Sequence, residues 1–441
     1  MNLDLERETL LHRYKASVGE MPDPPPLGIE VLYKESRAEY HEWKITYTAE
    51  TPATMPTPAG QRVSAYLLTP RWSGDGPFPA MVCFHQCNVD CVLAKEAVVG
   101  KTAETTPDQH YGFELVRQGF AVLAPDSLNC GERNIPALRQ KDENKPCWPD
   151  IHDHPDIGRP SFNKKIYDGV RAVDVLQALD FVDSERIGAI GHSMGSHDAF
   201  HAAAYDTRVR AVILSGFNVS QFLPLHAPRL HMAYKGALDG ESPLRPDKVP
   251  AIIEEIRQTY ESARRHWEAA GAADDLVLRV GRSGHVFVED FKKEAYARLK
   301  RHFGIVPQKS DVSLRSLLEA ARQDTWTWNR EERYFPPIEV PGSCRVLVDK
   351  EKVQQAFAFL FVHLFLKRDG AAPALRVRVQ SIRDAAEIRC AVPARNDSAP
   401  VYFSEPDEGV FVENGATLHK ERKGDAVEYV VNLPITHKVD P

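Results

Sequence analysis

The stretch Asp183-Ser-Glu-Arg-Ile-Gly-Ala-Ile-Gly-His-Ser-Met-Gly195 decides the fold of this 441-residue chain. Its apolar middle predicts a buried strand, and a helical pattern follows at Met194–Tyr205. The five residues Gly191-His-Ser-Met-Gly195 join the two. A Gly-x-Ser-x-Gly turn between a strand and a helix lifts the serine hydroxyl above the sheet, where N–H groups of the helix N-terminus can stabilise an oxyanion. The stretch therefore predicts a nucleophile, Ser193; the alternative is a glycine-rich turn without chemistry.

Short apolar runs alternate with helical patterns on both sides of this stretch. Most runs are continuous, as expected for strands covered on both faces. This alternation predicts a doubly wound, mostly parallel α/β sheet with its active site at the carboxyl ends of the strands. The first two strands, joined by a turn at Thr51–Gly60, are expected to form an antiparallel hairpin. The predicted strands are His41–Thr48, Arg62–Thr69, Ala80–Phe84, Phe120–Ala124, Arg186–Ile190, Val209–Leu214, Arg229–Ala233 and Leu276–Val280, and the predicted helices are Gln109–Gln118, Ile166–Phe181, Met194–Tyr205, Ala251–Ala270 and Val288–His302.

The strand–helix alternation breaks near Gly304-Ile-Val-Pro307. Since one hydrophobic core stops growing at about 250–300 residues, we expect an α/β domain over 1–305, with an N-terminal extension, and a smaller α+β domain over 310–441. The patterns in the smaller domain are an amphipathic segment at Ser313–Gln323, a helix at Lys350–Lys367, strands at Leu375–Gln380 and Ala386–Val392, and a final hairpin turning at Lys423-Gly-Asp425.

Composition and charge exclude several classes of function. The chain carries 55 basic and 62 acidic side chains, a net charge of −7, so it has no basic stripe for a nucleic-acid backbone. No apolar run approaches the roughly 18–20 residues that cross a bilayer, and the first residues are charged. Seven cysteines, an odd number, indicate reduced thiols. We expect a cytoplasmic protein that binds neither nucleic acid nor membrane.

A serine nucleophile needs a base and an acid. His285 is the candidate base because it follows the last strand of the sheet, at its carboxyl end, and comes after the serine in chain order. Asp239 is the candidate acid because it lies past the carboxyl end of the preceding strand. Glu241 and Asp247 remain competitors for the acid, whereas Asp274 and Asp275 precede the last strand and would lie at the opposite edge of the sheet.

An oxyanion hole needs two donors. One is expected from the backbone N–H of Met194, and the other from the loop after Ala80–Phe84, where we assign Gln86 with Cys87 as the neighbouring possibility. His85 beside this loop and His192 beside the nucleophile, which the turn would aim to the wrong side for a base, are candidate pocket residues. Trp148, in a Pro-rich excursion between Asn129 and Phe162, is expected to line the pocket as part of a loop over the active site.

Two groups of metal-ligand residue types do not form a convincing metal site. The segment Trp148-Pro-Asp-Ile-His-Asp-His-Pro-Asp156 has no downstream partner pair to complete a ligand set. Cys83, Cys87 and Cys91 are spaced four apart without the second pair that a zinc site requires. We expect buried or pocket-lining thiols, and neither a metal nor a cofactor.

The chain resembles the α/β-hydrolase superfamily, and more narrowly its dienelactone-hydrolase-like and acetyl-xylan-esterase-like carboxylesterases. The resemblance implies Ser–Asp–His catalysis of ester hydrolysis without a cofactor, by Ser193, Asp239 and His285. It covers about residues 40 to 304. The matching stretches are Phe84-His-Gln86, Gly119-Phe-Ala-Val-Leu-Ala-Pro-Asp126, Gly131-Glu-Arg133, Asp168-Gly-Val-Arg-Ala-Val-Asp174, Asp183 to Gly195, and Gly284-His-Val-Phe287.

The C-terminal domain is similar, more weakly, to the ATP-binding domain of sensor histidine kinases. The similarity lies in Arg345-Val-Leu-Val-Asp349, Val353-Gln-Gln355 and Tyr429-Val-Val-Asn-Leu-Pro434. Where that family has magnesium-binding asparagines, this chain has Phe359 and His363, so the similarity implies a degenerate relative that binds no ATP. A structural, dimerising or partner-binding role is expected, including homo-oligomer formation through this domain.

The leading hypothesis is a serine hydrolase that cleaves a small or medium carboxylic ester through an acyl-enzyme on Ser193. A second hypothesis uses the same triad for a cyclase, acyl-transfer or carbon–carbon reaction, because fold alone does not select the reaction. A third hypothesis is a non-catalytic interaction protein, against which the intact serine, acid and histidine argue.

Overall fold

The structure is a computed structural model. It describes residues 3–37, 39–71, 76–87, 93–102, 107–134, 161–216, 220–239, 249–305, 309–329, 343–349, 353–354, 356–357, 360, 376–382, 385–393, 411–412, 416–423, 426–434 and 437–439. The chain divides into two compact units. The first unit comprises residues 1–70 and 74–305, and the second comprises residues 71–73 and 306–441.

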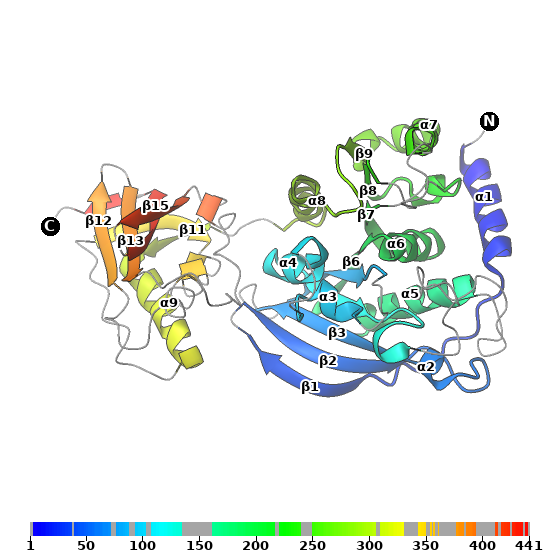
Figure 1. Ribbon diagram of the computed structural model, residues 1–441, viewed down its shortest axis with the longest axis horizontal. Helices are drawn as coiled ribbons and strands as arrows, with labels where there is room; N and C mark the ends of the chain where they lie inside the picture. Colours follow the sequence, from blue (N-terminus) through cyan, green and yellow to red (C-terminus); the bar gives the residue numbers. More distant parts are fainter. Residues whose placement is uncertain are drawn as a thin grey trace. The chain divides into compact units, whose positions relative to one another are not determined.

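The first unit is built on one nine-stranded sheet (Figure 1). The strands are β1 (Glu30–Ser36), β2 (Tyr40–Thr48), β3 (Arg62–Pro70), β4 (Phe78–Phe84), β5 (Ala121–Pro125), β6 (Val182–His192), β7 (Val209–Ser215), β8 (Leu230–Gly236) and β9 (Leu276–Gly281). They lie in the order β1-β2-β3-β5-β4-β6-β7-β8-β9. The six strands from β5 to β9 are parallel, whereas β1, β2 and β3 pair antiparallel. The predicted opening hairpin and mostly parallel sheet are confirmed.

Helices cover both faces of this sheet, which makes it doubly wound (Figure 1). One face packs against α1 (Leu3–Val18), α5 (Ser161–Gln177), α6 (Met194–Tyr205) and α7 (Val249–Glu268). The other face packs against α3 (Lys95–Val98), α4 (Tyr111–Arg117) and α8 (Glu289–His302). The shorter helical segments are α2 (Pro58–Gln61), η1 (Pro107–Gln109), η2 (Gly131–Arg133), η4 (Leu223–His226) and η6 (Ala273–Asp275).

Alternate residues of each central strand enter opposite cores, because successive side chains of a strand point to opposite faces. In β8, Met232 and Tyr234 join the core beneath α4 and α8, and Ala233 joins the core beneath α5 and α6. All residues of β4, β5 and β8 are buried. This is why the sequences of β4 and β5 are continuous apolar runs, whereas β8 also buries the polar residues His231 and Lys235.

The second unit contains two antiparallel sheets and helix α9 (Leu314–Asn329). The first sheet has the order β10-β11-β16, formed by Lys309–Ser313, Ser343–Asp349 and His437–Val439. The second has the order β12-β13-β15-β14, formed by Arg376–Ile382, Ala385–Pro393, Ala426–Pro434 and Thr417–Lys423. The predicted final hairpin is confirmed, since β14 and β15 pair from Lys423 with Ala426.

Several local predictions need correction. The sequence pattern did not indicate α1 or β1: α1 buries only Tyr14 and Val18 among its residues, and β1 is an exposed edge strand with charged residues. The predicted turn at Thr51–Gly60 ends in a short helix that begins at Pro58. Ser313, predicted to begin an amphipathic segment, is the last residue of β10, and the segment forms helix α9 from Leu314 onward.

Candidate active site

Ser193 occupies a strained turn between β6 and α6. Its backbone has φ 54° and ψ −121°, and a positive φ is uncommon for a residue with a side chain. The Ser193 N–H donates to the Ser215 carbonyl at the end of β7, at 2.8 Å. Because the neighbouring strand holds the turn, the strain is sustained by the surrounding fold.

The flanking glycines of the turn are required by close backbone approach. A Cβ on Gly195 would lie 2.1 Å from the Phe84 carbonyl oxygen at the end of β4. A Cβ on Gly191 would lie 2.1 Å from the Gly195 carbonyl oxygen. Neither distance is compatible with a side chain, so the Gly-x-Ser-x-Gly pattern follows from the packing of β6, α6 and β4.

His285 and Asp239 form a hydrogen-bonded pair. Nδ1 of His285 lies 2.9 Å from Oδ1 and 3.0 Å from Oδ2 of Asp239. A carboxylate only accepts, so Nδ1–H is the donor and Nε2 carries the free lone pair. Asp239 is 2% exposed, whereas the His285 side chain is 38% exposed.

The two loops that carry this pair are joined by backbone hydrogen bonds. The Ala237 N–H donates to the Gly281 carbonyl at 2.7 Å, and the Leu238 N–H donates to the Ser283 carbonyl at 2.9 Å. Both loops follow adjacent parallel strands, β8 and β9, at their carboxyl ends. The separation between Asp239 and His285 is therefore fixed by the sheet.

The ring of His285 lies beside the nucleophile turn. A Cβ on Gly216 would lie 2.8 Å from Cε1 of His285, so a glycine is needed where β7 ends. The His285 ring is also 4.7 Å, centroid to centroid, from the ring of His192, the residue before Ser193. The Ser215 carbonyl, which precedes Gly216, accepts the Ser193 N–H. His285 and Ser193 therefore both lie against the Ser215–Gly216 peptide at the end of β7.

Asp239 is held ionised by its partners. Burial raises the pKa of this carboxyl, but the hydrogen bond from His285 and the charges of His285 and Lys235 outweigh burial, and the pKa lies below its usual value. Nζ of Lys235 is 3.1 Å from Oδ2 of Asp239, and both side chains are almost fully buried. Lys235 was not among the predicted site residues.

His192 is buried and neutral. Its Nδ1 lies 3.0 Å from Oγ of Ser215. Burial, together with the nearby His285, lowers the pKa of His192 to about 4. The candidate pocket residue is therefore packed between β7 and the candidate base.

The candidate oxyanion donors lie where β4 and β6 end. Met194 is the first residue of α6, so its N–H has no acceptor within the helix. Gln86 is 3% exposed, and within the described ranges neither side-chain amide atom has a hydrogen-bond partner. His85 accepts the Ser127 N–H on Nε2 at 3.0 Å, which leaves Nδ1–H to donate to the Gln86 carbonyl at 2.8 Å. This neutral histidine holds the backbone of the candidate oxyanion loop.

The remaining predicted residues have different outcomes. Cys87 is partly buried and packs against Met194 and Cys130. Trp148 lies outside the described residues, as do Cys91, the segment 148–156 and the competing acids Glu241 and Asp247. Where the structure describes the chain, no group of three or more His, Cys, Asp and Glu side chains could hold a metal ion.

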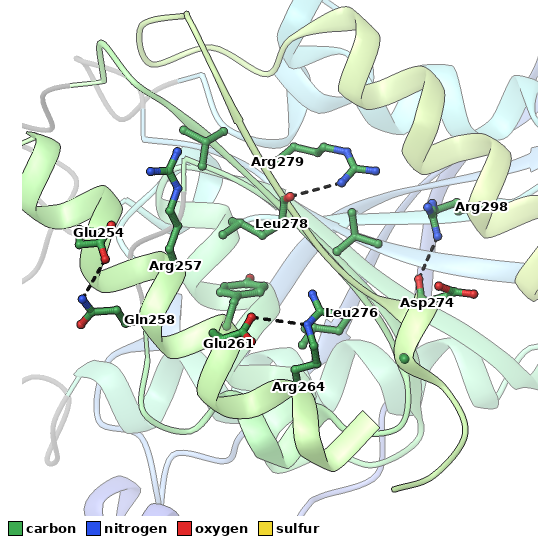
Figure 2. Close-up of a pocket in the computed structure, with 14 residues that line it drawn as sticks. Glu254, Arg257, Gln258, Glu261, Arg264, Asp274, Leu276, Leu278, Arg279 and Arg298 are labelled. Carbon is green, nitrogen blue, oxygen red and sulfur yellow. Dashed lines mark hydrogen bonds and ion pairs between the residues drawn. The ribbon is translucent and has the colours of Figure 1, made fainter. Parts of the chain in front are cut away.

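A pocket of about 810 Å³ lies away from these residues, along the outer edge strand β9 (Figure 2). Helix α7 contributes Arg257 and Arg264, β9 contributes Arg279, and α8 contributes Arg298. Several of these charges are paired internally: Arg279 and Arg298 both contact Glu294. Ser193, Asp239 and His285, which are all described, do not line this pocket.

This combination of sheet, nucleophile turn and His–Asp pair is characteristic of an α/β hydrolase. The "Alpha/beta hydrolase family" matches residues 106–381, more than half of the chain, and the chain belongs to this family. Over 314 residues it is 26% identical to the protein named "Putative hydrolase YtaP" of Bacillus subtilis (strain 168), a match that covers 64% of this chain and 95% of that one.

Two solved structures are similar at lower identity. The first is a "putative acetyl xylan esterase" from Bacteroides fragilis NCTC 9343, with 14% identity, 63% of this chain and 74% of the other covered, and a TM-score of 0.48. The second is a glucuronoyl esterase from Solibacter usitatus, with 15% identity, 67% and 91% covered, and a TM-score of 0.48. Among the helices of the described ranges, none is long and apolar enough to cross a membrane.

Proposed function

We propose that this α/β hydrolase is a serine esterase that cleaves a small or medium carboxylic ester through an acyl-enzyme on Ser193. The observation that carries the proposal is the imidazole of His285, hydrogen-bonded through Nδ1 to both oxygens of Asp239 and packed beside the turn that bears Ser193. A serine becomes a nucleophile when a positioned base accepts its proton.

In the proposed acylation, Ser193 Oγ attacks the acyl carbon while Nε2 of His285 accepts its proton. Asp239 fixes the tautomer and stabilises the imidazolium. The negative charge that forms on the acyl oxygen is stabilised by the N–H groups of Met194 and Gln86. The imidazolium then protonates the departing alcohol, which leaves the acyl group on Ser193.

In the proposed deacylation, a water molecule takes the place of the alcohol. His285 accepts a proton from this water, and the resulting hydroxide attacks the acyl carbon. Collapse of the second tetrahedral intermediate returns the proton to Ser193 and releases the acid. No cofactor is required for either half-reaction.

We further propose that the ester is of the kind taken by dienelactone-hydrolase-like or acetyl-xylan-esterase-like enzymes, on the motifs that this chain shares with them. The similarity of the second unit to a kinase ATP-binding domain stays a prediction, as do its role in dimerisation or partner binding and the cytoplasmic location. The proposed triad does not depend on any of these predictions.

The direct test is covalent labelling with a fluorophosphonate probe, followed by hydrolysis of esters of graded acyl length. We expect wild-type protein to be labelled on Ser193 and to hydrolyse an activated ester, and Ser193→Ala to lose labelling and at least about 10⁴-fold in kcat. Labelling at another residue, or unchanged turnover in Ser193→Ala, would refute the proposal.

Ser193→Gly serves as a matched control for folding. Glycine adopts positive φ freely, so this variant relieves backbone strain of about 1–3 kcal/mol. It should be as inactive as Ser193→Ala and yet more resistant to thermal unfolding than Ser193→Ala. Inactivity together with retained or increased stability separates loss of the nucleophile from loss of the fold.

A further inference from the structure

Lys235 stands next to the candidate catalytic acid. It lies in β8, one residue before the strand ends, and is 1% exposed. Its Nζ is 3.1 Å from Oδ2 of Asp239, the same oxygen that lies 3.0 Å from Nδ1 of His285. One carboxylate therefore serves a buried ammonium and an imidazole together.

A buried ammonium requires an anionic partner, because its desolvation costs several kcal/mol. Asp239 supplies this negative charge, and as a result it stabilises a protonated His285 less strongly. The Asp239–Lys235 pair has no net charge, so it stabilises an imidazolium less than an isolated carboxylate would. The lysine also holds Oδ2 in place, which keeps the carboxylate facing Nδ1.

We propose that Lys235 is a positioning residue of the esterase: acting through Asp239, it orients the carboxylate and keeps His285 in its neutral, proton-accepting form down to lower pH. The inference rests on the proposed function, because His285 must be the base. It goes beyond that function by assigning the lower pH limit of activity to a fourth side chain.

The other groups around His285 do not oppose its protonation in the way proposed for Lys235. His192, from the end of β6, is neutral above about pH 4 because burial and His285 lower its pKa. Asp108 of η1 acts on His192, and its charge would favour protonation rather than oppose it. Tyr234 and Ser283, hydrogen-bonded to each other at 2.8 Å, are uncharged. Within the described part of the site, Lys235 is the cation paired with the acid.

The test is the pH profile of kcat/KM for Lys235→Met and Lys235→Arg in the full-length protein. In Lys235→Met the acid limb should move to higher pH by about one unit, since the full carboxylate charge then stabilises the imidazolium. Lys235→Arg keeps a cation beside Asp239 and should leave the limb within a few tenths of a unit. The same displacement should be seen in protonation of His285 followed by imidazole NMR, with the signal assigned by its loss in His285→Gln.

Lys292→Met is the matched control. Lys292 is also buried, and its Nζ is 2.6 Å from Oε1 of Glu114, away from the triad. Its loss should lower stability without moving the acid limb. An acid limb that stays in place or moves to lower pH in Lys235→Met would overturn the inference.

The NMR measurement does not depend on turnover, so the two proposals can fail separately. If wild-type protein neither hydrolyses esters nor labels at Ser193, the proposed function fails. The displacement of the His285 titration in Lys235→Met would still show whether the lysine acts on the imidazole. If the enzyme is active but the titration is unmoved, only the inference about Lys235 fails.

Discussion

Among the described residues, two buried aspartates that closely follow parallel strands pair with a buried lysine, and one of these pairs belongs to the candidate active site. Asp126 follows β5 and pairs with Lys95, whereas Asp239 follows β8 and pairs with Lys235. Within each pair, the aspartate is at most 2% exposed. The pairs differ in what fills the remaining acceptor positions of the carboxylate.

At Asp126 those positions are filled by the backbone. Oδ2 accepts the backbone N–H of Glu132 at 3.1 Å, and Oδ1 accepts the backbone N–H of Lys95 at 3.4 Å. Lys95 Nζ also contacts Glu96 and Glu132, at 3.1 and 3.3 Å. This pair therefore connects the start of α3 with the segment that follows β5. At Asp239 the corresponding position is taken by an imidazole, which can exchange a proton with a substrate.

The difference shows that a buried acid at the active-site edge of the sheet is not by itself a sign of catalysis. The third partner distinguishes the two: backbone N–H donors fit a structural carboxylate, whereas a partly exposed histidine fits the proposed role of Asp239, which is to orient a base and stabilise its imidazolium. The two pairs can be compared by making the same substitutions in each.

The largest difference is expected from removing the negative charge of each aspartate. Asp239→Asn should lower kcat by about 10⁴-fold, because the amide favours the wrong imidazole tautomer, while Asp126→Asn should lower kcat by less than about tenfold. Initial rates on an activated ester, measured well below the unfolding temperature of each variant, check this. Equal losses at the two positions would remove the distinction between them.

Removing each lysine should affect stability more at the Asp126 pair than at the Asp239 pair, which is the reverse of the order expected for kcat. Lys95→Met removes the ammonium paired with buried Asp126, while Glu96 and Glu132 keep their ion pairs with Lys44; breaking a buried pair costs about 3–5 kcal/mol. Lys235→Met leaves Asp239 with His285, so its loss should be smaller, about 1–2 kcal/mol. Urea unfolding at pH 7 measures both values. A larger loss in Lys235→Met would mean that His285 contributes little to holding Asp239.

Much of this fold could be predicted because its elements repeat at regular spacing. The helix at Met194–Tyr205 and the strands that follow have the predicted type, and their order places residues 193, 239 and 285 at one edge of the sheet. Its place after the last strand of the sheet, together with chain order, then selected His285 from 17 histidines. The N-terminal α1 and β1 were missed because they bury little apolar surface, so no periodic signal marks them.

The partners that tune the site were beyond the sequence pattern. Lys235 could be read as the solvated end of a strand, since lysine is almost never fully buried unless paired. A spacing of four residues between Lys235 and Asp239 is the one available signal, and it acquires meaning only when the strand and its loop are both known to be buried. Likewise, glycine at 216 is favoured both by its φ of 68° and by the close approach of the His285 ring, which is distant in sequence.

His85 links the two regions and offers a smaller test. It accepts the Ser127 N–H, next to Asp126, and donates to the Gln86 carbonyl in the candidate oxyanion loop. His85→Phe should lower kcat by about tenfold with little change in KM, because a displaced Gln86 N–H stabilises the transition state less. Steady-state kinetics check this prediction. A change confined to KM would place His85 in substrate binding instead.

The smallest expected effect is the acid dependence of stability at Asp239. The pKa of this carboxyl is lower in the folded protein than the value of about 3.9 expected when unfolded. A lowered acid pKa contributes stability that is present above the unfolded pKa and is lost as pH falls through the folded pKa. Unfolding free energies of wild type and Asp239→Asn should therefore differ more at pH 5 than at pH 3. A difference that widens at pH 3 would mean that burial outweighs both partners, and Asp239 would then resemble an acid kept neutral rather than one kept ionised for catalysis.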